Sequence, residues 1–455
     1  MPTTTSPDRF ARWKAAAENC DPVEVRGRVT RVVGLLVESS GPAAAVGEIC
    51  ALAAGDALFG YAEVVGFRAD TTLLMPLGGM EGIRPGLEVV ATGSPLMAPT
   101  GSGLLGRILD GLGNPLDELG PLPSGRRPVT AHAPHPLKRR RIHQTMGTGV
   151  RVLDAFLTLG RGQRMGIFAG SGVGKSVLLG MLARHCEADV NVICLIGERG
   201  REVREFLERD LGPEGMARSV VVCATSDQPA VVRVKSAFVA TAIAESFRDE
   251  GKDVLLMMDS STRLAMAQRE IGLAVGEPPA TKGYTPSVFA LLPQVFERAG
   301  TSDRGSITGL YTVLADGDDM DEPVADAIRS ILDGHVVLSR DLANRNHFPA
   351  IDVLRSISRC MSDVAGDDHR KAARELLSLL AVYRENEDLI NLGAYTKGSN
   401  PQIDLAIRMR DRLLNFVKQD RGDSTSETDS HAELLRMAQA ARVPVSARAA
   451  APRQG

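Results

Sequence analysis

An apolar strand, a glycine-rich turn and the start of a helix follow one another in the stretch QRMGIFAGSGVGKSVLLG, residues 163–180. Backbone N–H groups in such a turn converge on phosphate oxygens. A strand that leads directly into such a loop is typical of an α/β fold with a mainly parallel sheet. The stretch therefore predicts this fold class and a site for the phosphates of a nucleotide.

Each position of the loop has a task in this prediction. Gly172 and Gly174 are expected to need positive φ or close approach. Lys175 offers a charge to the β- and γ-phosphates, and the Ser176 hydroxyl can ligate Mg²⁺. Ala169 stands where the usual pattern G-x-x-x-x-G-K-[ST] begins with glycine, but extended backbone accepts a methyl group there. The predicted nucleotide-binding residues of the loop are Gly170, Ser171, Gly172, Val173, Gly174, Lys175, Ser176 and Val177.

The chain of 455 residues is longer than one typical domain, and its pattern changes along its length. Residues 1–20 contain a short helix, and the β-type runs of residues 21–95 predict a small barrel or sandwich. Residues 96–362 hold a connecting segment and the α/β domain. Residues 363–455 hold amphipathic helices and a loose tail. No run approaches a membrane span and no secretory signal is evident, so we expect a cytoplasmic protein.

The composition of the chain and the spacing of its cysteines and histidines limit the ligands and partners that the sequence suggests. The net charge is −3, which gives no general attraction to nucleic acid, and the six cysteines and eight histidines lack metal-site spacing. The basic run at residues 138–141 is expected to be a solvated linker face. Phe10, Trp13 and Ala17 share one face of the first helix, which either packs on the β-domain or docks into a partner.

Apolar runs alternate with helical stretches after residue 147, as in a parallel sheet covered by helices. The expected strands are QRMGIFAG, VNVICLIG, SVVVCAT, DVLLMMD, SITGLYTVLAD and HVVLS. Asp259 ends one of these strands and is the expected carboxylate beside Mg²⁺. Glu198 follows another and is the candidate general base, since α/β sheets bind ligands at the carboxyl ends of their strands. A surface ion-pair cluster of Glu198, Arg199, Arg201 and Glu202 remains the alternative at this point.

With these motifs the sequence resembles the rotary-type hexameric ATPases, and among them the flagellar type III export ATPases, the FliI family. The resemblance runs from about residue 20 to residue 420 and is most specific in AGSGVGKSVLLG, GERGREV, MDSSTRLAMAQREIGLAVGEPPATKGYTPSVFALLP, GSITGLYTVLADGDDMDEPVADAIRSILDGHVVLSR and NHFPAIDVLRSISR. Alanine at the place of Ala169 is usual in that family. The resemblance implies an N-terminal β-barrel, a central RecA-like P-loop ATPase domain and a C-terminal α-helical domain in a ring of six.

The resemblance also implies roles for single residues in Mg²⁺-dependent ATP hydrolysis. Glu198 matches the residue that polarises the attacking water, and Arg199 matches a γ-phosphate contact. Arg359 matches the arginine finger that a neighbouring subunit donates, whereas Arg355 is expected to be structural or accessory. Phe348 and Tyr395 match the aromatic slot for adenine. The positions around Mg²⁺ and the γ-phosphate are matched by Ser176, Glu202, Asp259 and Arg263.

The implied partners are a FliH-type regulator on the helix with Phe10 and Trp13, a FliJ-type stalk in the ring, a membrane export gate, and export substrates with their chaperones. Such a protein is cytoplasmic and peripherally associated with the gate. An injectisome type III secretion ATPase shares nearly all these motifs. A Rho-like RNA translocase is less favoured, because the β-domain shows few exposed-looking aromatics for base stacking. A scaffold that binds nucleotide without hydrolysis is disfavoured by the intact Lys175, Glu198, Asp259 and Arg359.

Overall fold

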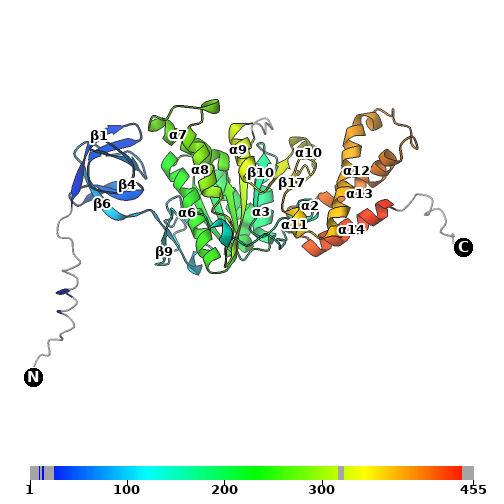
Figure 1. Cartoon of the computed structure of the whole chain (residues 1–455), viewed down its shortest axis with the longest axis horizontal. Coiled ribbons are helices and arrows are strands. Elements are labelled where there is room, and N and C mark those ends of the chain that lie inside the picture. The colour runs from blue at the N-terminus through cyan, green and yellow to red at the C-terminus, as the bar shows by residue number, and fades with distance from the viewer. Residues whose placement is uncertain (1–9, 11–12, 15–24, 316–321, 443–455) are drawn as a thin grey trace, which may run out of the picture. The chain divides into compact units, whose positions relative to one another are not determined.

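The computed structural model describes Phe10, residues 13–14, residues 25–315 and residues 322–442. Contacts divide the chain into two compact units, Met1–Pro95 and Leu96–Gly455. The described part of the first unit is mainly strands, and the second combines a large sheet with helices (Figure 1).

The first unit contains a closed β-barrel with the strand order β1-β2-β5-β4-β3-β6. Val37, Cys50, Leu52 and Val64 are fully buried inside it, and alternate residues of its strands point outward. Closure pairs every strand on both sides, which removes open sheet edges. The barrel strands are β1 (Arg26–Val33), β2 (Leu36–Ser40), β3 (Glu48–Ala54), β4 (Ala57–Arg68), β5 (Thr71–Pro76) and β6 (Glu88–Pro95).

The second unit is built on a nine-stranded sheet, in the order β17-β16-β10-β15-β13-β11-β12-β8, with β14 paired to β15. The six strands expected after residue 147 are confirmed as β10 (Arg164–Ala169), β11 (Val190–Ile196), β12 (Ser219–Ala224), β13 (Asp253–Asp259), β15 (Ser306–Leu314) and β16 (Gly334–Leu338). They run parallel, so their carboxyl ends meet at one edge. The remaining strands of the sheet are β8 (Ile108–Asp110), β14 (Gly300–Thr301) and β17 (Ile357–Ser358).

Helices cover both faces of this sheet, so its central strands are apolar on both sides (Figure 1). On β11, Ile193 and Leu195 face the core that includes α3. Val192 and Cys194 face the opposite core, which includes α6 to α9. The helices and turns of this part are α2 (Arg151–Phe156), α3 (Lys175–His185), α4 (Gly200–Glu205), the π-helical η3 (Phe206–Leu211), α5 (Gly212–Ala217), α6 (Ala230–Asp249), α7 (Ser261–Ala274), η4 (Thr281–Gly283), α8 (Pro286–Phe296), α9 (Pro323–Ile331), α10 (Arg340–Asn344) and α11 (Met361–Val364).

The C-terminal part is helical, as the amphipathic pattern predicts. It consists of α12 (Asp367–Asn391), α13 (Pro401–Val417) and α14 (Glu427–Arg442). Leu376, Leu413 and Leu434, one from each helix, belong to the same buried cluster as α2 and α3. The helical part is therefore packed on the α/β part through a continuous core.

Arginines hold the segment before the phosphate loop against the rest of the second unit. It contains β7 (Met97–Pro99), η1 (Ser102–Leu104), β9 (Arg126–Pro128) and η2 (Pro136–Lys138). Arg139 donates to the backbone oxygens of Glu297 and Ala299, and Arg140 Nε donates to Ser302 O at 2.8 Å. The expectation of a solvated basic run is therefore wrong for Arg139, which is only partly exposed, whereas Arg140 stays exposed while it contacts the turn after α8.

A buried ion pair fastens β9 to α6 and α8. The guanidinium of Arg298 donates to both oxygens of Glu245, at 2.9 and 2.7 Å, and each side chain is 1% exposed. Arg127 approaches the same carboxylate at 3.3 Å, and Arg298 also donates to Val129 O at 2.7 Å. These contacts satisfy a charge that could not otherwise be buried.

Glu245→Ala is expected to lower the free energy of unfolding of the second unit by about 3–5 kcal/mol, because the Arg298 charge would stay buried without a counter-ion. Glu208→Ala is the control. Its carboxylate pairs with Arg204 at 2.7 Å, but the two side chains are 64% and 80% exposed, so its loss is expected to cost about 0–1 kcal/mol. Urea unfolding followed by circular dichroism checks the difference. Equal shifts for the two variants would contradict it.

Candidate active site

The phosphate loop connects the end of β10 to the start of α3 at the carboxyl edge of the sheet. Gly172 has φ 77° and Gly174 has φ 91°, so the expected need for positive φ is confirmed. A Cβ on Gly174 would also lie 3.4 Å from Phe348 Cε1. Ala169 is the last residue of β10 and its methyl group is buried in the core. Alanine therefore fits at that position without disturbing the loop.

Lys175, at the start of α3, contacts carboxylates from two neighbouring strands. Its Nζ donates to Asp259 Oδ1 and lies 3.6 Å from Glu198 Oε1. The order β10-β15-β13-β11 produces this meeting, because the loop after β10, the end of β13 and the end of β11 share one edge. The structure thus brings together three residues that the sequence separates by up to 84 positions.

Glu198 is buried, with 8% of its surface exposed. Burial raises the pKa of its carboxyl to about 7, as do Asp259 and a hydrogen bond with Glu202, while Lys175 and Arg263 oppose the rise. Arg263 Nη2 lies 3.3 Å from Glu198 Oε2, and its other nitrogen donates to Gly197 O. A carboxylate with a pKa near neutrality is suited to accept a proton from water.

The alternative of a surface ion-pair cluster is wrong for Glu198, which pairs inward with Lys175 and Arg263. Of the residues in that alternative, Arg199 and Glu202 do form an ion pair at the surface. The Arg199 side chain is 76% exposed and its Nη1 donates to Glu202 Oε1 at 2.9 Å. The hydrogen bond with Glu198, followed by Arg199, lowers the pKa of Glu202. Glu202 therefore links the exposed arginine to the buried carboxylate.

A cavity of about 100 Å³ opens among these side chains. Ser176 reaches it from α3, and carboxylates of α4, η3 and the strand ends surround it. Two of them, Glu205 and Asp210, carry no sequence motif and were not predicted. Asp210 lies at the end of a π-helical turn, a feature that often marks functional sites. The polar lining residues are Ser176, Glu198, Glu202, Glu205, Asp210 and Asp259.

The two residues predicted to hold adenine, Phe348 and Tyr395, have different surroundings in the structure. Phe348 is 40% exposed next to Gly174. Tyr395 lies between α12 and α13, where its hydroxyl donates to Asn400 O at 2.9 Å, and it lines a cavity with α13 and the end of α14. The segment after α13 contacts Phe348 instead, since Gln419 N donates to Phe348 O at 2.9 Å. No motif in that segment indicated this contact.

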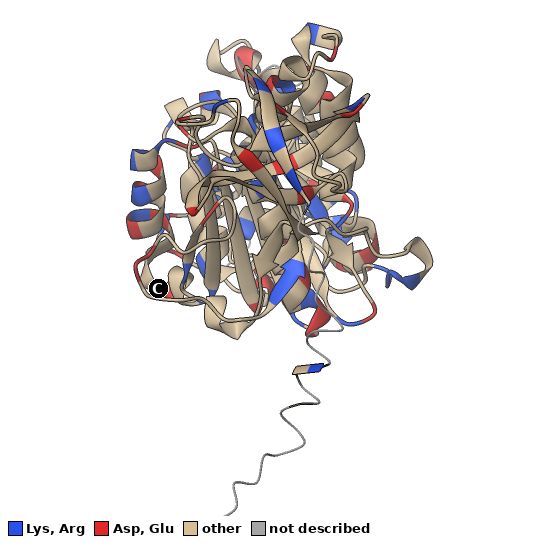
Figure 2. Cartoon of the chain, turned by 90° about the vertical axis from the view of Figure 1, so that its left-hand side faces the viewer, with Lys and Arg blue, Asp and Glu red and all other residues tan. Residues whose placement is uncertain are grey.

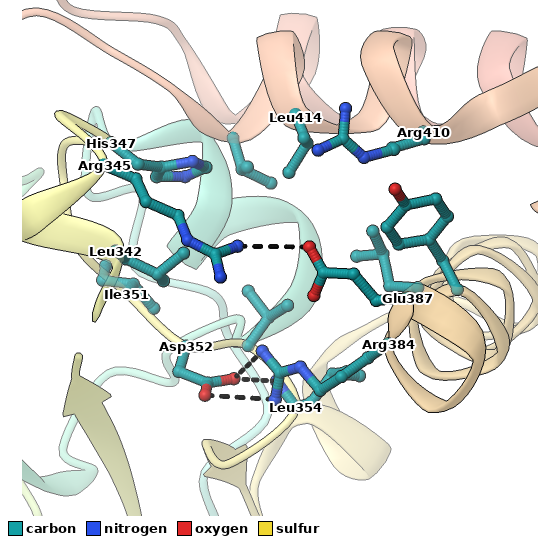
Figure 3. Close-up of a pocket in the computed structure, with 14 residues that line it drawn as sticks. Leu342, Arg345, His347, Ile351, Asp352, Leu354, Arg384, Glu387, Arg410 and Leu414 are labelled. Carbon is teal, nitrogen blue, oxygen red and sulfur yellow. Dashed lines mark hydrogen bonds and ion pairs between the residues drawn. The ribbon is translucent and has the colours of Figure 1, made fainter. Parts of the chain in front are cut away.

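The segment that carries Phe348 is tied to the helical part by ion pairs (Figure 3). Arg384, on α12, donates to both oxygens of Asp352, at 3.2 and 3.0 Å, and Arg345 lies 3.3 Å from Glu387 of α12. A cavity of about 110 Å³ lies between the two parts. Burial lowers the pKa of His347, at its edge, to about 4. A displacement of α12 would therefore shift the residues around Phe348 through these ion pairs.

Arg355 and Arg359 lie in the segment after β16 and differ in their surroundings. Arg355 lines a small cavity with Ala169 and Gly170, next to the phosphate loop of its own chain. Arg359 is exposed, directly after β17, and its backbone N–H donates to Asp333 O at 3.0 Å. Its backbone is thus fixed while its side chain faces outward.

Phe10 and Trp13 are described as helical, with ring centroids 5.9 Å apart. Their exposed fractions are 67% and 66%, so the structure does not bury this face against the barrel. The helices of the described residues include none with the length and apolar character to cross a membrane.

Comparison with protein families matches the chain in three parts. Residues 149–358 match the nucleotide-binding domain of the ATP synthase alpha/beta family, and residues 29–93 match the β-barrel domain of that family. Residues 365–436 match the C-terminal domain of the type III secretion ATPase EscN. The expected order of barrel, ATPase domain and helical domain is thereby confirmed.

Similar curated proteins match over most of their length. The flagellum-specific ATP synthase of Bacillus subtilis is 54% identical over 424 residues, which cover 92% of this chain and 96% of that protein. The type 3 secretion system ATPase of Xanthomonas euvesicatoria is 53% identical over 411 residues, which cover 90% and 93%. The assembled ATPase EscN of enteropathogenic E. coli superposes with a TM-score of 0.85 at 44% identity, over 90% of this chain and 100% of that one. The same ATPase in complex with its central stalk EscO gives a TM-score of 0.84.

Proposed function

The chain belongs to the flagellar and type III secretion ATPases of the ATP synthase alpha/beta family, and we propose that it hydrolyses ATP for the flagellar type III export apparatus. One observation supports hydrolysis rather than binding alone. Lys175 contacts both Asp259 and the buried Glu198, and these two carboxylates line one cavity with Ser176. The lysine expected to bind the phosphates and the carboxylate expected to act as base can therefore contact the same nucleotide.

The chain's own residues account for the chemical step. Amides of the loop and Lys175 hold the β- and γ-phosphates, so Lys175 leaves its carboxylate partners when ATP binds. Glu198 accepts a proton from the attacking water as the new oxygen–phosphorus bond forms and the bond to ADP breaks. Arg263 orients Glu198, which it already contacts. Arg199 is the further candidate for a γ-phosphate contact.

The residues of the cavity fit a magnesium ion. Ser176, Glu202 and Asp259 would hold it, because hydroxyl and carboxylate oxygens are the ligands that Mg²⁺ prefers. When bound, the ion neutralises charge on the phosphate oxygens. The described residues hold no cluster of three or more His, Cys, Asp or Glu arranged to bind a metal by themselves, which agrees with an ion that arrives with its nucleotide.

We further propose a ring of six identical chains with the nucleotide at each interface. The exposed Arg359 would act as a finger on the neighbouring subunit's ATP, since its own chain holds its backbone but leaves its side chain outward. The assembled relative and its complex with a stalk protein support a ring and a FliJ-type stalk. Phe348 would stack on adenine, with the segment at Gln419 as the neighbouring wall and Tyr395 as a more distant candidate.

Flagellar and injectisome relatives are both similar to this chain, and injectisome secretion is the second candidate function. Expression in a flagellate strain that lacks its own flagellum-specific ATPase separates them. We expect restored secretion of hook and filament proteins, and we propose that the chain works in the cytoplasm at the export gate. Rescue of injectisome secretion alone would favour the second candidate.

An RNA translocase has less support, since the described barrel residues include few exposed aromatics. Tyr61 and Phe67, both on β4, are exposed, at 48% and 52%. However, basic and acidic residues are interspersed over the ribbon (Figure 2), and two rings do not form a charged, aromatic-lined groove. ATPase activity stimulated by RNA would revive this candidate.

Trp13→Ala is expected to weaken binding of a FliH-type regulator by about 10-fold to 100-fold, because an exposed tryptophan is a typical anchor of an interface. Basal ATPase activity should stay within about twofold, since Trp13 lies outside the ATPase unit. Titration calorimetry with the regulator measures the first effect. Lys14→Ala, on the same turn, is the control, and equal affinities for Trp13→Ala and the unmodified protein would refute the docking role.

A further inference from the structure

A buried hydroxyl lies next to Asp259 on the neighbouring strand. Thr312 belongs to β15, which runs between β10, the strand that enters the phosphate loop, and β13, the strand that ends in Asp259. Its side chain has no exposed surface. The pairing of Tyr311 with Met258 places Thr312 level with Asp259.

The Thr312 hydroxyl has one proton to donate. Its Oγ1 lies 2.7 Å from Asp259 Oδ1 and 3.3 Å from Met258 O, so the carboxylate is the closer acceptor. The same Oδ1 accepts from Lys175 Nζ. One carboxylate oxygen therefore receives two donors, of which one is a neutral group fixed on a central strand and the other is a flexible charged side chain.

We propose that Thr312 is a positioning residue that keeps Asp259 in place when Lys175 exchanges this carboxylate for the phosphates of the nucleotide. The inference rests on the proposed ATP hydrolysis. Asp259 is only 4% exposed, and a buried carboxylate that loses a donor without replacement is costly. Because the Thr312 hydroxyl remains, the lysine can leave at a lower free-energy cost.

Removal of this hydroxyl should make Lys175 bind Asp259 more firmly and release it less readily. The nucleotide would then compete with a tighter ion pair, which raises KM and the Kd for nucleotide more than it lowers kcat. A purely structural role for the hydroxyl would instead lower stability and leave the affinity of the folded enzyme unchanged. The two roles therefore predict different measurements.

Thr312→Val removes the hydroxyl at nearly constant shape. We expect the KM for ATP, measured with Mg²⁺, and the Kd for a fluorescent ADP, measured separately in EDTA so that the metal plays no part in binding, each to rise about fivefold to tenfold. Thr312→Ser retains the hydroxyl and should stay within about twofold of the unmodified protein. The matched control is Thr308→Val, since Thr308 is also buried on β15 but accepts from Gly162 N at 2.8 Å instead.

An unchanged Kd in folded Thr312→Val would overturn the proposal, as would a serine variant that behaves like valine. An equal rise in Kd in Thr308→Val would overturn it too, because the effect would then be general to the strand. If the valine variant does not fold, comparison of Thr312→Ser with Thr312→Ala isolates the hydroxyl in the same way. An unmodified protein that hydrolyses no ATP in assembled form would contradict the proposed function instead.

Discussion

Glu198→Gln is expected to lower kcat for ATP hydrolysis by about 100-fold to 10,000-fold, the usual contribution of a general base. Glutamine preserves the shape of the side chain but cannot accept the proton of the attacking water. ATP binding should be retained or strengthened, since Lys175 would face one fewer negative charge. Phosphate release by assembled protein measures turnover, and a fluorescent ATP analogue measures binding.

Glu205→Gln is the matched control for this variant. Glu205 lines the same cavity but is exposed and lies outside the predicted catalytic set. Its turnover is expected to stay within about threefold of the unmodified protein. If Glu198→Gln keeps more than about a tenth of normal turnover, the assignment of the base is wrong.

The raised pKa of Glu198 gives this assignment a pH signature. The base works only when deprotonated, so kcat/KM, which reports the free enzyme, should rise with pH and level off above the pKa of about 7. Glu198→Gln should lose this acidic limb because glutamine does not titrate. A profile of the same shape in both proteins would assign the limb to another group.

Arg359→Ala is expected to lower kcat about 1,000-fold or more, as loss of an arginine finger does in other phosphoryl-transfer enzymes. The guanidinium would neutralise charge that develops on the phosphoryl group bound by the neighbouring subunit. Stability should change little, because the side chain is exposed. Turnover measured against protein concentration separates loss of catalysis from loss of assembly.

Mixed rings provide the sharper experiment. An interface that takes Glu198 from an Arg359→Ala chain and Arg359 from a Glu198→Gln chain has both groups intact, so mixing the two inactive variants should restore part of the activity. Arg374→Ala, at an exposed position of α12, is the control and should have normal turnover. Normal activity of Arg359→Ala, or no recovery on mixing, would reject a finger shared across an interface.

The sequence was a sufficient guide wherever a feature depends on neighbours in the chain. The loop between β10 and α3, the six strands of the sheet and the helices α12 and α13 follow from apolar spacing and glycine position. The apolar pattern of residues 21–95 predicted a small barrel or sandwich but not its strand order, because closure depends on which strands pair. The short strand β8 was missed, because its glycine-rich surroundings read as a loop and its pairing with β12 bridges distant residues.

The sequence by itself determined the chemistry available at the site: glycines that accept positive φ, a lysine and serine at a helix start, and carboxylates where apolar strands end. Only the tertiary structure decided how these groups are paired. The order β10-β15-β13-β11 sets Lys175 against Asp259 and Glu198, buries Glu198, and adds Thr312 beside Asp259. It also brings Gln419 rather than Tyr395 to Phe348. These contacts join residues far apart in the chain, and strand order, which local patterning does not encode, determines which of them meet.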